Sequence, residues 1–167
     1  IYTLYLSVSL AYSFMEVFTI YTLYNIDTIP PFVNRLAHQL FICSLVLILM
    51  FLFLYVDMLT RKQKRYKPVE LIVSILPALI AFVITAFGDI EYYVGNDGMY
   101  SYGPVVTVLY CCLGIYALWA IITLIRRRRT VPGHIMLTVL CGVSGWIVIG
   151  IVQMLNPTWL IESMGVS

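Results

Sequence analysis

Five long apolar stretches, separated by short polar connections, constrain this chain more than any other feature of its sequence. They cover residues 1–25, 32–59, 68–87, 104–125 and 132–155. A helix needs about 20 mostly apolar residues to cross a bilayer, and each stretch reaches that length. Of the 167 residues, 62% are hydrophobic and only 11% are charged, whereas a soluble domain carries about 25% charged residues. The sequence therefore predicts a single all-α membrane domain, residues 1–167, built as a bundle of about five transmembrane helices.

The basic residues predict how this bundle is oriented. Nine of the ten Lys and Arg residues lie in two connections, residues 61–67 and residues 126–129, and Arg35 is the remaining one. Cytoplasmic loops of membrane proteins carry an excess of Lys and Arg, so we expect both basic loops to face the cytoplasm. Such runs can also contact anionic membrane lipids. Asp57, just before the first run, is expected to balance charge at this inner interface.

The segment from Gly88 to Gly103 is predicted to form a small extracellular β-hairpin. Two short runs flank the residues 95–98, Gly-Asn-Asp-Gly, and these residue types tolerate the positive φ of tight hairpin turns. Tyr100 and Tyr102 would then share one face, because side chains alternate along a strand. One interpretation makes the hairpin a lid whose tyrosines contact a ligand. The alternative makes it a simple connector between two helices.

Several polar side chains lie inside the apolar stretches, where each needs a partner or a function. Arg35, His38 and Gln39 share one helix face by their i, i+3 and i+4 spacing. Glu16 falls at a similar depth on the preceding helix, and Gln153 lies near the outer end of the fifth stretch. One hypothesis is a Glu16–Arg35 or Glu16–His38 pair that only fixes helix packing. The other is a polar pocket in the outer half that binds a small molecule through these side chains and the two tyrosines.

Residues for catalysis or metal binding are not arranged in any recognisable motif. The four cysteines lie inside apolar stretches without a CxxC pair, as expected for small buried side chains. We therefore expect no enzyme activity from these residues, no cofactor, no metal site and no nucleic-acid partner. Pro77 predicts a bend in the third helix.

Three short segments resemble a known family. They are Ile29-Pro30-Pro31-Phe32 running on through the second stretch to Val56, then Asp97-Gly98-Met99-Tyr100-Ser101-Tyr102-Gly103-Pro104, and finally Gln153-Met154-Leu155-Asn156-Pro157. The chain resembles the multi-helix N-terminal membrane sensor region of bacterial, mainly Firmicutes-type, signalling proteins that end in a GGDEF diguanylate cyclase domain. Related regions precede histidine kinases. Tyr102 stands where the family often has Arg, so an anion-binding role of that arginine does not carry over.

The resemblance implies a receptor domain in a bacterial plasma membrane. It would bind a small molecule from the extracellular side and control a cytoplasmic output, a diguanylate cyclase that produces cyclic-di-GMP. A homodimer could form through this output domain. Residues 158–167 are expected to begin a further helix leading to that output. The main alternative is a small transporter or channel subunit, for which broken helices or repeat symmetry would be expected and are not visible. A lipid-modifying enzyme is a third alternative, with only His134 and its basic neighbours to support it.

Overall fold

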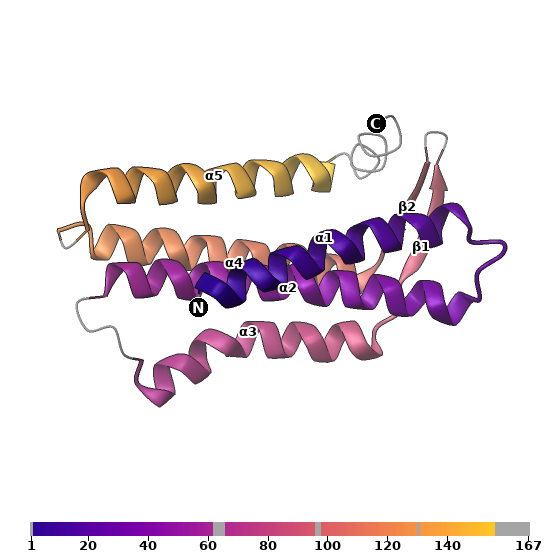
Figure 1. Cartoon of the computed structure of the whole chain (residues 1–167), viewed down its shortest axis with the longest axis horizontal. Coiled ribbons are helices and arrows are strands. Elements are labelled where there is room, and N and C mark those ends of the chain that lie inside the picture. The colour runs from indigo at the N-terminus through magenta and orange to yellow at the C-terminus, as the bar shows by residue number, and fades with distance from the viewer. Residues whose placement is uncertain (1, 62–65, 96–97, 130, 156–167) are drawn as a thin grey trace.

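The helices that the structure describes run side by side in alternating directions (Figure 1). They are α1 (Tyr2–Tyr24), α2 (Pro31–Thr60), α3 (Pro68–Phe87), α4 (Pro104–Arg126) and α5 (Gly133–Leu155). The structure is a computed structural model, and it describes residues 2–61, 66–95, 98–129 and 131–155. Each helix begins and ends within one residue of the corresponding apolar stretch. The prediction of a helical bundle is confirmed.

The alternating directions give the bundle two distinct ends. The connection from α1 to α2 and the segment between α3 and α4 lie at one end, which we call the hairpin end (Figure 1). The segments that leave α2 and α4, at Arg61 and Arg127, lie at the opposite end, which we call the basic end. The expected start of a further helix at residues 158–167 lies outside the described residues.

Proline starts three of the helices, at Pro31, Pro68 and Pro104. This residue suits the first helical turn, where its missing N–H would have had no partner. Between α3 and α4, strand β1 (Glu91–Gly95) pairs antiparallel with β2 (Gly98–Tyr102). Gly103 then joins β2 to α4 with a φ of 121°, a conformation that residues with a Cβ rarely adopt.

Helix α2 is the centre of the bundle, since it packs against α1, α3 and α4. Buried residues make up 44% of its most apolar window, against 6% for α1. The core fills the middle of the bundle with apolar side chains, among them Val46, Leu49, Phe53, Ala78, Ala81, Ala117 and Ala120. Polar side chains are buried mainly toward the two ends of the bundle, so the candidate functional sites lie there.

Candidate functional site

Buried polar side chains gather at the hairpin end, on α1 and α2, and we call them the buried cluster. Thr22, Asn34 and His38 are each 2% exposed or less, and Thr19 is also buried. The Thr19 hydroxyl donates a hydrogen bond to the Ala37 carbonyl oxygen across the two helices, at 3.3 Å. The two helices are antiparallel. Thr22 lies three residues after Thr19 on α1, and Asn34 lies three residues before Ala37 on α2, so both are at the same depth. The two helices therefore bury polar groups where a membrane protein usually buries apolar ones.

Asn34 is the unusual member of this cluster. Its side chain makes no hydrogen bond in the part of the chain that the structure describes, and its Oδ1 atom is buried. On α3, the buried Thr85 Oγ1 atom also has no hydrogen-bond partner there. A buried polar group without a partner costs about 1 to 3 kcal/mol, so nearly all such groups in proteins are bonded. The side-chain oxygens of Asn34 and Thr85 are therefore unsatisfied polar atoms at the hairpin end of the described structure.

His38 lies one helical turn after Asn34 on the same face of α2. Its Nδ1 atom lies 3.0 Å from the Asn34 carbonyl oxygen. The ring is therefore oriented by the backbone of the residue whose amide side chain is unbonded. His38, a predicted site residue, belongs to the buried cluster, but the structure joins it there to Asn34, which the sequence did not single out.

Glu16 and Arg35 do not form the ion pair that one of the two hypotheses expected. The Glu16 carboxylate accepts a hydrogen bond of 3.1 Å from the Tyr12 hydroxyl, one turn away on the same helix. Arg35 lies instead 3.7 Å from the Asp89 carboxylate, and it donates to the Gly88 carbonyl oxygen at 3.2 Å. Glu16 is at the expected depth, but the face of α2 that carries Arg35 meets α3, whereas α1 packs on a different side.

Gln39 shares this α3-facing side of α2. Its Nε2 atom donates to the carbonyl oxygens of Thr85 at 2.9 Å and Ala86 at 3.3 Å. The last carbonyls of a helix have no partner within that helix, so Gln39 and Arg35 satisfy the C-terminal end of α3. These two predicted ligand-binding residues hold helices together here.

The role of Gln39 gives a stability prediction. Replacing Gln39 with Leu should lower the free energy of unfolding by about 1 kcal/mol, because the part-buried Thr85 carbonyl and the exposed Ala86 carbonyl lose their donor. Replacing Arg35 with Leu should change it by less than about 0.5 kcal/mol, since the Arg35–Asp89 pair is exposed to solvent. Unfolding in a titration with SDS measures both, and equal losses in the two variants would contradict this assignment.

The side chains of Tyr100, Tyr102 and Gln153 lie outside the described part of the structure. A ligand contact by any of the three, and the lid that the two tyrosines would form, therefore stay predictions.

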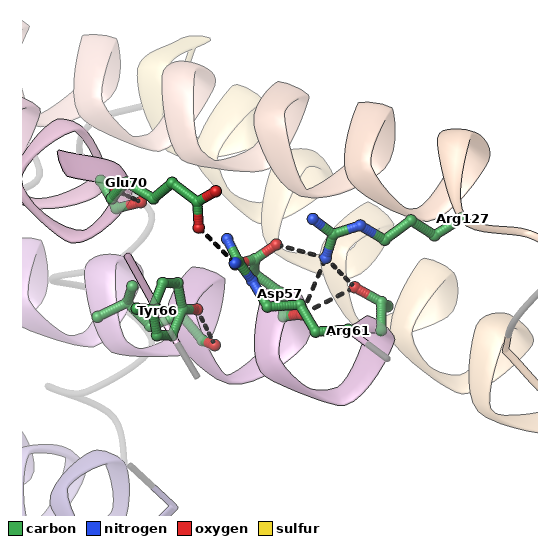
Figure 2. A network of polar contacts seen from close by, with 8 residues as sticks. Asp57, Arg61, Tyr66, Glu70 and Arg127 are labelled. Carbon is green, nitrogen blue, oxygen red and sulfur yellow. Dashed lines mark hydrogen bonds and ion pairs between the residues drawn. The ribbon is translucent and has the colours of Figure 1, made fainter. Parts of the chain in front are cut away.

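A second polar cluster, at the basic end, joins three helices through a buried carboxylate (Figure 2). The side chain of Asp57 is 5% exposed and accepts from Arg61 Nε at 2.7 Å and from Arg127 Nη1 at 2.8 Å. Arg127 Nη1 also donates to Thr60 Oγ1 at 3.1 Å, and Arg61 Nη1 lies 2.5 Å from Glu70 Oε2. The expected pairing of Asp57 with the basic run is confirmed, and it ties α2 to both α3 and α4.

Tyr66 covers this network from the segment that leads into α3. Its ring lies under the Arg61 guanidinium, with the centroid 4.3 Å from Cζ, and its hydroxyl donates to the Leu54 carbonyl oxygen at 3.0 Å. Burial raises the pKa of the Tyr66 phenol, and the Asp57 carboxylate raises it further. Partial burial of Arg61 acts to lower its pKa, but hydrogen bonds with Glu70 and Asp57 raise it overall. Both groups therefore keep their protons, and the network is a fixed structural joint.

Sequence reasoning missed Thr19, Thr22, Asn34 and Thr85 because uncharged polar residues are common in transmembrane helices. The spacing did carry a signal for one of them. Asn34 precedes His38 by four residues, so the two had to share a helix face. In the described ranges, no three His, Cys, Asp or Glu side chains are grouped closely enough to hold a metal ion.

These features define a multi-pass membrane protein. Four of the described helices, α1 to α4, are long and apolar enough to cross a membrane, and the 23-residue α5 has a similarly apolar composition. Many large apolar side chains on the outer faces are exposed, among them Leu10, Phe14, Val17, Ile72, Val83 and Leu118. No protein-family model, no curated protein and no solved structure matches the chain.

Proposed function

We propose that this chain is the ligand-sensing membrane domain of a bacterial signalling protein. It binds a small molecule at the hairpin end, which faces the extracellular side, and controls a cytoplasmic output of the diguanylate cyclase type. The observation that carries the proposal is the unbonded side chain of Asn34, buried beside His38 and at the depth of Thr22. The output type and the orientation rest on the family resemblance and on the distribution of basic residues.

The chemistry of the buried cluster favours an uncharged ligand. The Asn34 amide offers one acceptor oxygen and one donor nitrogen. Both charged groups predicted at this depth are already engaged, Glu16 with Tyr12 and Arg35 with Asp89. A charged ligand would have to be desolvated without an opposite charge, at high cost. A small neutral molecule that both donates and accepts hydrogen bonds, such as an amide or a polyol, fits the cluster.

Binding would act on the output by favouring one arrangement of the helices over another. Asn34 and His38 lie on α2, which contacts α1, α3 and α4. A ligand bonded to these side chains adds contacts to α2 that are absent without it. Helix α2 then leads directly to the Asp57 network at the basic end, where a cytoplasmic output would receive the change.

The test uses the full-length parent protein in lipid nanodiscs. A panel of small amides, polyols and sugars is added one compound at a time while thermal stability and cyclic-di-GMP formation are measured. We expect at least one compound to raise the melting temperature and to change the cyclase rate. Both responses should be lost in the Asn34→Leu variant.

The variant Asn25→Leu is the matched control. Asn25 also lies at the hairpin end, but its Nδ2 atom already donates to the Tyr21 carbonyl oxygen at 2.9 Å. It should therefore respond to the compound like the wild type. A parent gene that encodes no output domain would contradict the signalling part of the proposal. Equal responses in the Asn34→Leu variant and the wild type would contradict the binding site.

A further inference from the structure

Helix α3 contains a break in its hydrogen-bond ladder near its middle. Pro77 lies inside the helix, has no N–H group, and leaves the carbonyl of Val73 without its helical donor. The Ser74 hydroxyl donates back to the Glu70 carbonyl oxygen at 2.8 Å, a bond that also favours bending. The ribbon of α3 changes direction in its first half (Figure 1).

A side chain from α4 is inserted into the ladder next to this break. The Tyr116 hydroxyl donates to the Ser74 carbonyl oxygen at 3.0 Å and accepts from the Ala78 N–H at 3.2 Å. In a regular helix, the Ala78 N–H and the Ser74 carbonyl would bond directly to each other. Insertion of a side chain into the i to i−4 ladder is a recognised cause of helix kinks.

Tyr116 is buried and closely packed in this position. It is 2% exposed, and its ring lies 5.7 Å, between centroids, from that of Phe53 on α2. One turn earlier on α4, the Cys112 thiol lies 3.7 Å from the Pro77 carbonyl oxygen. Two consecutive turns of α4 therefore contact α3 at the bend.

The two ends of α3, in contrast, are bonded to α2. Glu70, in the first turn, pairs with Arg61, and the last carbonyls accept from Gln39 and Arg35. Helix α2 thus fixes both ends of α3 while α4 fixes its middle. Any displacement of α4 relative to α2 must either change the bend of α3 or break the Tyr116 hydrogen bonds.

We propose that α3 is a hinged helix whose bend at Pro77 is set by the Tyr116 hydroxyl of α4. When Tyr116 withdraws, the Ala78 N–H and the Ser74 carbonyl can bond directly, and the helix straightens at this point. The hinge converts a movement between α2 and α4 into a change of shape in α3. It rests on these contacts alone and holds whatever ligand the hairpin end binds.

Hydrogen exchange of the Ala78 amide, followed by NMR on alanine-labelled protein in nanodiscs, tests this hinge. The variant Tyr116→Phe keeps the ring but removes the hydroxyl. Because the Phe ring still separates Ser74 from Ala78 but bonds neither, their direct bond does not form, and we expect exchange at Ala78 to rise about tenfold, the factor that corresponds to one lost buried hydrogen bond. Tyr110→Phe is the matched control on the same helix, because the Tyr110 hydroxyl makes no hydrogen bond in the described part of the chain.

A second variant distinguishes the hinge from simple packing. Pro77→Ala restores the missing N–H and a continuous ladder, so the Tyr116→Phe change made in that background should alter Ala78 exchange by less than about threefold. The same increase with and without Pro77 would overturn the hinge. So would a Tyr116→Phe variant whose Ala78 exchange stays within about twofold of the wild type, as the Tyr110→Phe control should.

Discussion

Replacing Asp57 with Asn should lower the free energy of unfolding by about 3 kcal/mol. The Asp57 carboxylate is 5% exposed and bonds both Arg61 and Arg127. The substitution keeps the size of the side chain but leaves two partly buried guanidinium groups facing a neutral amide. Removing one partner of a buried ion pair costs about 3 to 5 kcal/mol. We expect the lower end, because Arg127 is one-third exposed and Arg61 keeps its bond to Glu70.

Reversible unfolding by SDS in mixed micelles measures this loss. Asp27→Asn is the matched control, since Asp27 is exposed in the connection between α1 and α2 and forms no ion pair with any described residue. Its free energy of unfolding should stay within about 0.5 kcal/mol of the wild type. A similarly small change in the Asp57→Asn variant would show that the network does not hold α2, α3 and α4 together.

The second large expected effect is a stabilisation of the folded protein. Replacing Asn34 with Leu should raise the free energy of unfolding by about 2 kcal/mol in the absence of ligand. Leu has the same branching at Cγ, and it removes a buried amide that makes no hydrogen bond in the described structure. A binding residue whose removal stabilises the empty protein is typical of sites that sacrifice stability for function.

The variant Asn25→Leu is the control. It shows whether the stabilisation comes from removing an unbonded amide or only from adding a more hydrophobic side chain. Asn25 is partly exposed, and its amide is bonded to the Tyr21 carbonyl oxygen, so Asn25→Leu should be neutral or destabilising. SDS unfolding of both variants provides the comparison. Destabilisation by Asn34→Leu would mean that the amide already has a partner in the folded protein, and the argument for a vacant binding group would fail.

Much of the fold could be predicted from the sequence because its physical basis is local. A run such as residues 68–87 is long enough to span a bilayer, begins at a proline and ends before a glycine, and α3 occupies that range. Asp57 could also be assigned correctly, because a carboxylate four residues before Arg61 on one helix face must meet it. The bounds of α3 and the pairing of Asp57 with Arg61 are each determined by residues only a few positions away in the sequence.

The partners of residues on different helices could not be predicted in the same way. Helical spacing places Arg35 and Gln39 on one face, but it does not say which neighbouring helix that face meets. The expected neighbour was α1 with Glu16, whereas the structure places α3 there, with its unpaired C-terminal carbonyls. Depth along the membrane normal is readable from residue counts, while the rotation of each helix depends on packing over the whole bundle.

Tyr116 illustrates the same limit. Pro77 predicts a bend in α3, but nothing near Tyr116, 39 residues later in the chain, indicates that its hydroxyl enters the break. An aromatic residue in a transmembrane helix is usually a packing or interfacial residue. Its second role depends on α3 and α4 lying in contact, a property of the tertiary structure.

We propose that the buried side chain of Asn34 belongs to a binding site, and a high-resolution structure of the protein in lipid tests this most directly. The sample should carry the compound that gives the largest thermal shift. We expect non-protein density within about 3.2 Å of the Asn34 amide, near His38. Density confined to a single ordered water molecule, or a protein group bonded to that amide, would contradict it.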